Sequence, residues 1–135
     1  MGYAEVIVDA SALLAVMLKE DDAELFHDAL DVQGVLKFIT PINAWEVTAR
    51  LIRLGEKDAL GLLGDVLDLY GITIASIGER EYHQAVEAQS RFGKGNHPAQ
   101  LNMGDCFAYA LARTRGEPLL YKGNDFARTD VATAV

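Results

Sequence analysis

Cysteine, proline and long apolar runs are all scarce in this chain of 135 residues. The one cysteine, Cys106, excludes an internal disulfide framework and is typical of a protein in a reducing cytoplasm. With three prolines, the chain has no proline-rich linker, and its apolar runs fall short of the ~20 residues that a membrane span needs. The N-terminal segment lacks the basic start of a secretory signal and carries Glu5 and Asp9. We therefore expect a cytoplasmic protein without a membrane span.

Positive charge is also in the minority. Twelve Lys and Arg residues stand against twenty Asp and Glu residues, which gives a net charge of −8 and a pI near 4.7. Proteins that hold nucleic acid by releasing counterions need clustered basic residues, so any nucleic-acid function of this chain must come from a local site. The same charge balance suits a basic polypeptide partner or metal cations.

Strand-like and helix-like segments alternate along the chain. Short β-branched or apolar runs predict strands at 5–9, 35–40, 72–77, 118–122 and, as an edge strand, 130–135. Apolar residues at helical spacing predict helices at 11–19, 21–31, 42–54, 56–70, 78–92 and 103–115. The alternation indicates one domain over residues 1–135, an α/β sandwich with a mostly parallel sheet of four or five short strands.

Four acidic residues occupy special positions in this scheme. Asp9 ends the first strand, Glu46 lies in the second turn of a helix, Asp105 lies in the first turn of another, and Asp125 follows a strand in a turn. In parallel α/β sheets, sites form beyond the carboxyl ends of the strands, so all four side chains can face one edge of the sheet. Four neighbouring carboxylates repel one another unless a cation neutralises them.

The residue types favour Mg²⁺ for that cation, with Mn²⁺ as a second possibility, because both ions prefer oxygen ligands. His27, His83 and His97 are scattered without the spacing of metal ligands. Each acid also has a purely local interpretation. Asp9 or Asp105 can stabilise a helix start, Glu46 can pair with Arg50 or Arg53, and Asp125 can form an Asx-turn.

Four segments together resemble a known family. They are VDASALLAVML around Asp9, residues 40–54 around Glu46, LNMGDCFAYALA around Asp105 and LLYKGNDFARTD around Asp125. This series, which spans nearly the whole chain, is similar to PIN-domain proteins, and specifically to the VapC-type toxins of bacterial toxin–antitoxin pairs. The resemblance implies a three-layer sandwich, with helices on both sides of the sheet, and a metal-dependent endoribonuclease held inactive by a VapB-type antitoxin.

The resemblance also implies roles for individual residues. Asp9, Glu46, Asp105 and Asp125 match the family's four acidic catalytic positions, and three of them, Asp9, Asp105 and Asp125, are expected to hold the metal ion. Four further residues match positions that often line the site in the family: Ser11, Thr40, Asn124 and Asp130. A homodimer is also implied, for which the apolar faces of residues 23–30 and 42–54 are candidate surfaces.

A ribonuclease also needs basic side chains near its acidic site to steer RNA toward it. We expect five basic residues, in or beside the segments that carry the acids, to do this: Lys94, Arg113, Arg115, Lys122 and Arg128. One alternative is a catalytically silent binding module of the same fold that engages RNA or a protein partner. Another is a phospho-acceptor signalling domain, but the paired acids that such a domain needs beside its first strand are missing.

Overall fold

The computed structural model describes residues 4–95 and 97–135. At its centre lies a sheet of four strands in the order β3-β2-β1-β4, and every neighbouring pair is parallel. The strands are short: β1 (Glu5–Val8), β2 (Leu36–Ile39), β3 (Ile72–Ile74) and β4 (Leu119–Leu120). The predicted α/β sandwich with a parallel sheet is therefore confirmed.

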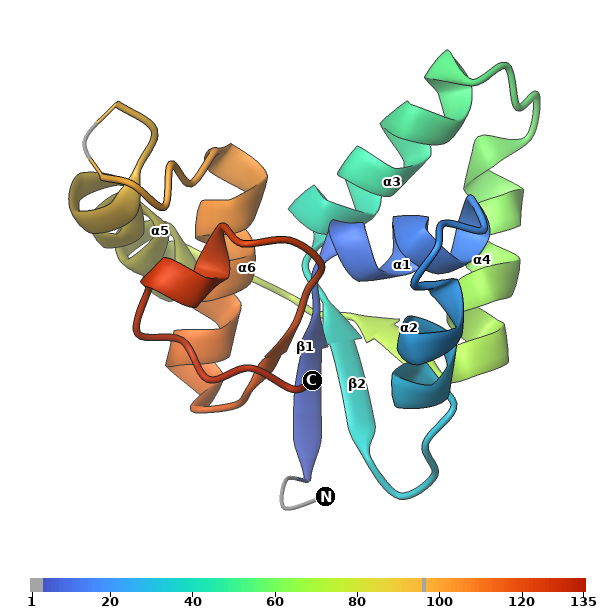
Figure 1. The fold of residues 1–135 in the computed structure, drawn as a ribbon, viewed down its shortest axis with the longest axis horizontal. Coiled ribbons are helices and arrows are strands. Elements are labelled where there is room, and N and C mark those ends of the chain that lie inside the picture. The colour runs from blue at the N-terminus through green and yellow to red at the C-terminus, as the bar shows by residue number, and fades with distance from the viewer. Residues whose placement is uncertain (1–3, 96) are drawn as a thin grey trace.

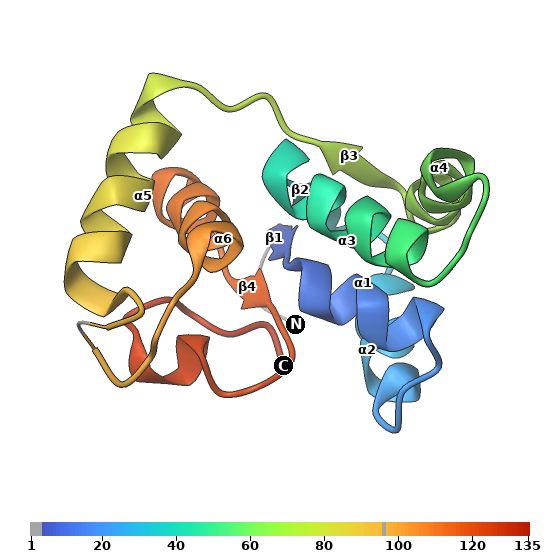
Figure 2. The same ribbon diagram turned by 90° about the horizontal axis from the view of Figure 1, so that it is seen from above.

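Helices cover both faces of this sheet (Figures 1 and 2). One face carries α1 (Ala10–Met17), α2 (Ala23–Leu30), α3 (Pro41–Arg53) and α4 (Ala59–Tyr70). The other carries α5 (Glu79–Phe92) and α6 (Met103–Arg115), which pack along each other, and the chain then passes through β4 into the short 3₁₀ helix η1 (Phe126–Arg128). No helix among the described residues is long and apolar enough to cross a membrane.

The alternation of side chains along β1 explains the three layers. Val6 and Val8 point into the core beneath α1 to α4, whereas Ile7 points into the core beneath α5 and α6, and all three are buried. Successive residues of a strand face opposite sides, so a strand that is apolar throughout must be covered on both faces. The apolar residues Val6, Ile7 and Val8 of β1 therefore require helices on both sides of the sheet.

Local signals set the limits of the helices. Thr40 caps α3 by accepting a hydrogen bond from the Asn43 backbone N–H at 2.9 Å, and Pro41 takes the first helical position. Gly71 and Gly116 end α4 and α6 in the left-handed conformation, which glycine adopts without strain. α4 begins at Ala59, three residues later than predicted, because Asp58 rather than Glu56 caps it.

The predicted edge strand at 130–135 is wrong. These residues, all within the described part of the chain, run beside β4 but form only one isolated parallel bridge, between Thr133 and Leu119. Two backbone hydrogen bonds to Leu119 hold them there.

Candidate functional site

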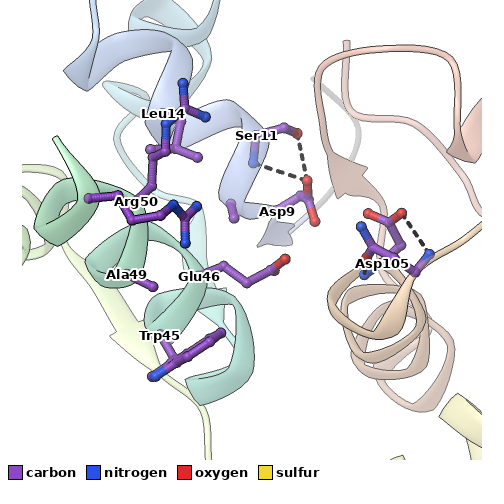
Figure 3. A pocket seen from close by; sticks show the side chains of 11 residues that line it. Asp9, Ser11, Leu14, Trp45, Glu46, Ala49, Arg50 and Asp105 are labelled. Atoms are coloured by element: carbon purple, nitrogen blue, oxygen red, sulfur yellow. Dashed lines mark hydrogen bonds between the residues drawn. The ribbon is translucent and has the colours of Figure 1, made fainter.

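The carboxyl edge of the sheet opens into a cavity of about 340 Å³. Asp9, Glu46 and Asp105 line it, and they come from three separate elements of the fold. In Figure 3 the Asp9 and Glu46 side chains point into the space that faces Asp105 on α6. The structure therefore brings these three acids, which are distant in the sequence, together at the carboxyl edge of the sheet.

Asp9 directly follows β1 and caps α1. Its Oδ2 accepts two hydrogen bonds from Ser11, one from the backbone N–H at 3.0 Å and one from the hydroxyl at 2.5 Å. The Ser11 hydroxyl also accepts a bond from the Lys122 N–H at 2.9 Å, which ties the segment after β4 to this corner. Ser11 thus lines the cavity, as predicted, and holds the nearly buried Asp9 carboxylate in place.

Glu46 is oriented by a residue that the sequence reasoning missed. The Asn43 amide donates to Glu46 Oε1 at 2.8 Å and to the Gly104 carbonyl at 3.0 Å, and it is fully buried. The Glu46 carboxylate lies directly against Gly104, where a Cβ atom would overlap it. Asn43 therefore links α3, in one layer, to α6, in the other, at the point where the carboxylates meet.

Asp105 lies in the first turn of α6, and a reciprocal capping pair holds it. The Asn102 side chain accepts a hydrogen bond from the Asp105 N–H at 2.9 Å, and Asp105 Oδ2 accepts one from the Asn102 N–H at 3.1 Å. Only 9% of Asp105 is exposed, so the carboxylate is fixed in direction and poorly solvated.

The pKa values of all three carboxylates are raised. Burial is the largest cause for all three, and it raises the pKa of Asp105 to about 7, with the charge of Asp9 as the second cause. The pKa values of Asp9 and Glu46 are raised as well, although the hydrogen bonds from Ser11 and Asn43 act against the shift. The site therefore holds more negative charge than its surroundings can solvate, and a cation would relieve it.

Asp125 lies outside the cavity lining. It stands at the start of η1 with an exposed side chain. Its charge nevertheless contributes to the raised pKa values of both Asp9 and Asp105, so it lies within electrostatic range of them. The fourth predicted acid is thus near the site, on the side of the β4 segment, but not in contact with the cavity.

Three of the predicted secondary residues lie elsewhere. Thr40 is fully buried, and its hydroxyl donates to Asn43 Oδ1 at 2.5 Å, so it supports Asn43 rather than lining the cavity. Asp130 accepts a hydrogen bond from the Tyr109 hydroxyl and pairs with Arg91, which fastens the C-terminal segment to α5 and α6. Asn124 is exposed and does not line the cavity either. None of these three residues lines the cavity itself.

The donor set fits a hard cation. The cavity lining offers carboxylate and amide oxygens and no thiol or imidazole, which matches the preference of Mg²⁺ and Mn²⁺. Within residues 4–95 and 97–135, no three His, Cys, Asp or Glu side chains converge closely enough to hold one ion directly. Mg²⁺ commonly uses one or two carboxylates and keeps several waters, so this wider spacing suits an ion held partly through water.

Three of the predicted RNA-steering cations are engaged in surface ion pairs. Lys122 Nζ lies 2.7 Å from Glu20 Oε1, and Arg115 lies 2.7 Å from Glu5 Oε1. Arg113 lies 3.9 Å from the Asp130 carboxylate. These contacts give the three side chains structural partners away from the cavity.

Arg50 and Arg53 line the cavity instead, together with Asp9 and Asp105. The local interpretation that Glu46 pairs with one of them is wrong, because neither arginine takes part in an ion pair within the described part of the chain. A helical spacing of four or seven residues allows such a pair, but Asn43 turns Glu46 toward α6.

The histidines and the cysteine have local roles. His27 Nδ1 lies 2.7 Å from the Tyr70 hydroxyl, and His97 Nδ1 accepts the Ala99 N–H at 3.0 Å within its own loop. His83 pairs weakly with Glu79 at 3.7 Å on the surface of α5. Burial raises the pKa of the Cys106 thiol to about 11, so it remains protonated, as expected of a structural residue.

Comparison with known proteins gives consistent matches along the chain. The sequence profile of the PIN domain matches residues 6–132. Ribonuclease VapC42 of Mycobacterium tuberculosis is 36% identical over 130 residues, covering 96% of this chain and 98% of that protein.

Two solved structures share the fold. One is VapC20 of Mycobacterium tuberculosis, described as a toxin that cleaves the sarcin-ricin loop, with a TM-score of 0.76 at 14% identity over 94% of this chain and 96% of that one. The other is a toxin–antitoxin complex from Klebsiella pneumoniae, with a TM-score of 0.68 at 17% identity over 96% of this chain and 98% of that one.

Proposed function

Because the chain belongs to the PIN-domain family, and within it to the VapC ribonucleases, we propose that it is a metal-dependent endoribonuclease that hydrolyses RNA phosphodiester bonds. It is the toxin of a VapBC-type toxin–antitoxin pair and acts in the cytoplasm. One observation carries the proposal: Asp9, Glu46 and Asp105 come from three distant segments and line one cavity at the carboxyl edge of the sheet.

Asp9 and Asp105 would hold the cation, Mg²⁺ or alternatively Mn²⁺, and Asp125, which lies outside the cavity lining, would reach it through water. When bound, a divalent ion supplies an activated water and polarises the phosphoryl oxygen. Glu46 would ligate the ion through water or would orient the attacking water. The raised pKa values of Asp9 and Asp105 support this assignment, because such carboxylates gain most from a neighbouring positive charge.

The surrounding residues keep these groups in position. Ser11 fixes the direction of the Asp9 carboxylate, Asn43 holds Glu46, and the Asn102 backbone holds Asp105. Such fixed groups need little reorganisation when charge develops on a phosphoryl group in a poorly solvated cavity. Asn43 is a positioning residue in this scheme, since it touches Glu46 rather than the substrate.

The partner is a VapB-type antitoxin, and the acidic surface of this chain suits a basic segment in it. The structure from Klebsiella pneumoniae supports this assignment, because a chain with the fold of this protein belongs there to a toxin–antitoxin complex. We also propose a homodimer. The residues that line the inner faces of α2 and α3, such as Phe26, Leu30 and Val47, belong to the core. The dimer must therefore use exposed residues, such as Leu25 on α2.

The test is the cleavage of a defined RNA pool by antitoxin-free protein in Mg²⁺, Mn²⁺ or EDTA. We expect metal-dependent cleavage by the unaltered protein, loss of cleavage in Asp105→Asn, and full activity in a matched control, Asp65→Asn, whose carboxylate is exposed on α4. Equal cleavage by the unaltered protein and Asp105→Asn would point to a contaminating nuclease. A folded, partner-free protein that binds RNA without cutting it would instead be a silent binding module.

A further inference from the structure

One wall of the carboxylate cavity is cationic. Arg50 and Arg53 lie on α3 four and seven residues after Glu46, so all three side chains share one face of the helix. At 1.5 Å per residue, the two arginines follow Glu46 by about 6 Å and about 10 Å along the helix axis. The helix thus presents one acid and then two cations along one face.

Both guanidinium groups are available to a ligand. In the described part of the chain, the ion pairs and the arginine side-chain hydrogen bonds all belong to other residues, and both Arg50 and Arg53 are exposed. This contrasts with Arg113, Arg115 and Lys122, which all have acidic partners. Their availability follows from the site itself, because Asn43 holds the nearest acid, Glu46, toward Gly104.

An exposed aromatic ring lies beyond the acids. Trp45, also on α3, borders the cavity and exposes 64% of its surface. Figure 3 shows Trp45 and Arg50 on opposite sides of Glu46 along α3. A ligand that lies along this helix therefore meets, in order, an aromatic surface, the carboxylates and two arginines.

We propose that α3 is the track for a single strand of RNA, with a base stacked on Trp45 and the phosphates beyond the cleaved bond held by Arg50 and Arg53. Arginine pairs with phosphate through two parallel hydrogen bonds, and exposed aromatic rings stack on bases with little regard to sequence. A single strand is required because Asp9 and Asp105 are nearly buried at the bottom of the cavity, where the phosphates of a rigid duplex do not reach. This inference rests on the proposed function, since it places the reacting phosphate at the carboxylates.

The test measures the binding of a short, fluorescein-labelled single-stranded RNA by anisotropy, in Mg²⁺ and over a series of salt concentrations. All variants carry Asp105→Asn, which prevents cleavage. Arg50→Gln and Arg53→Gln together should weaken binding at least tenfold and reduce the slope of log K against log salt by about 1.4, at ~0.7 for each lost phosphate contact. Trp45→Ala should weaken binding by roughly tenfold without changing that slope, since stacking carries no charge.

Two further variants separate charge from structure. Replacing both arginines by lysine should keep most of the salt slope, because the positive charges remain. Arg80→Gln on α5, whose only side-chain bond within the described residues is to the Thr114 carbonyl, should bind RNA as the reference does. Circular dichroism should show all variants folded, because the substituted Arg and Trp side chains are exposed and the Asn at position 105 can still accept the Asn102 N–H.

The outcomes distinguish this inference from the proposed function. If a protein that cleaves RNA keeps its affinity and salt slope after both arginines are replaced, the α3 track is wrong and the ribonuclease assignment stands. If the same substitutions weaken only the binding of a co-expressed antitoxin, the surface belongs to the protein partner and the inference is overturned. If RNA binds through both arginines but is never cleaved, the track stands and the enzymatic proposal fails.

Discussion

The ionised Asp105 carboxylate should destabilise the metal-free protein. Its pKa is raised from 3.8 to about 7, so the folded chain binds the proton more tightly than the unfolded chain does. The folded state is therefore favoured at low pH, and the free energy of unfolding falls as pH rises from about 4 to about 7. Each pKa unit corresponds to ~1.4 kcal/mol, so ionised Asp105 should lower the free energy of unfolding by about 4 kcal/mol in total.

Asp105→Asn tests this reasoning because it removes the charge and keeps the shape. The amide oxygen can still accept the Asn102 N–H, so the capping of α6 survives. We expect the variant to be roughly 2 to 4 kcal/mol more stable than the unaltered protein at pH 8, and the two proteins to converge toward pH 4.

The assay is urea denaturation in EDTA at several pH values between about 5 and 8, followed by far-ultraviolet circular dichroism. Asp65→Asn, on the exposed surface of α4, should follow the unaltered protein at every pH. Added Mg²⁺ should stabilise the unaltered protein at pH 8 more than it stabilises Asp105→Asn, because binding to the folded state raises its stability. Parallel pH profiles for Asp105→Asn and the unaltered protein would refute the argument.

Two further predictions concern the packing around the site. Gly104→Ala should displace the Glu46 carboxylate and lower ribonuclease activity at least tenfold while the protein stays folded. Gly64→Ala, in open space on α4, should leave activity intact and raise the free energy of unfolding by about 0.5 to 1 kcal/mol, and equal activities in the two variants would contradict the role of Gly104. Asn43→Ala should lower the free energy of unfolding, measured by urea denaturation, by about 2 to 3 kcal/mol, because it leaves buried partners such as the Thr40 hydroxyl unsatisfied. A loss below about 1 kcal/mol would mean that the Asn43 hydrogen bonds contribute little to stability. A third prediction concerns the dimer. In light scattering, Leu25→Glu should convert a dimer of the unaltered protein to a monomer if α2 lies in the interface, and a dimer unaffected by the substitution would place the interface elsewhere.

The sequence was sufficient for the features that depend on local pattern. The alternation of strands and helices predicted the α/β sandwich, and the ends of the strands predicted which edge of the sheet collects the acids. Asp9 and Asp105 were found because each combines a helix start with a position beside a strand or a polar loop. Residues 130–135 were misread because an apolar, β-branched tail predicts a strand, whereas here the tail forms only a single bridge to β4.

The features that the sequence did not reveal depend on contacts between distant segments. Asn43 reads as an ordinary residue in the first turn of a helix, and its bond to Gly104 crosses 61 positions of sequence. The availability of Arg50 follows from the direction of the Glu46 side chain, which helical spacing alone leaves open. Asp130 looked like a site residue because it lies near Asp125 in sequence, but Tyr109 and Arg91 hold it on another surface.

The position of β4 has a consequence for the synthesis of the protein. The first strand, β1, takes an interior place in the sheet and pairs with Leu119 and Leu120, which are made near the end of translation. Asp105 and the Lys122 N–H that bonds Ser11 are also made late, so the site around Asp9 is completed only near the end of translation. A chain released at Gly116 should be readily digested by protease and unable to cut RNA. An incomplete chain therefore cannot cleave the RNA of the ribosome and messenger that produce it, and a folded, active fragment would contradict this conclusion.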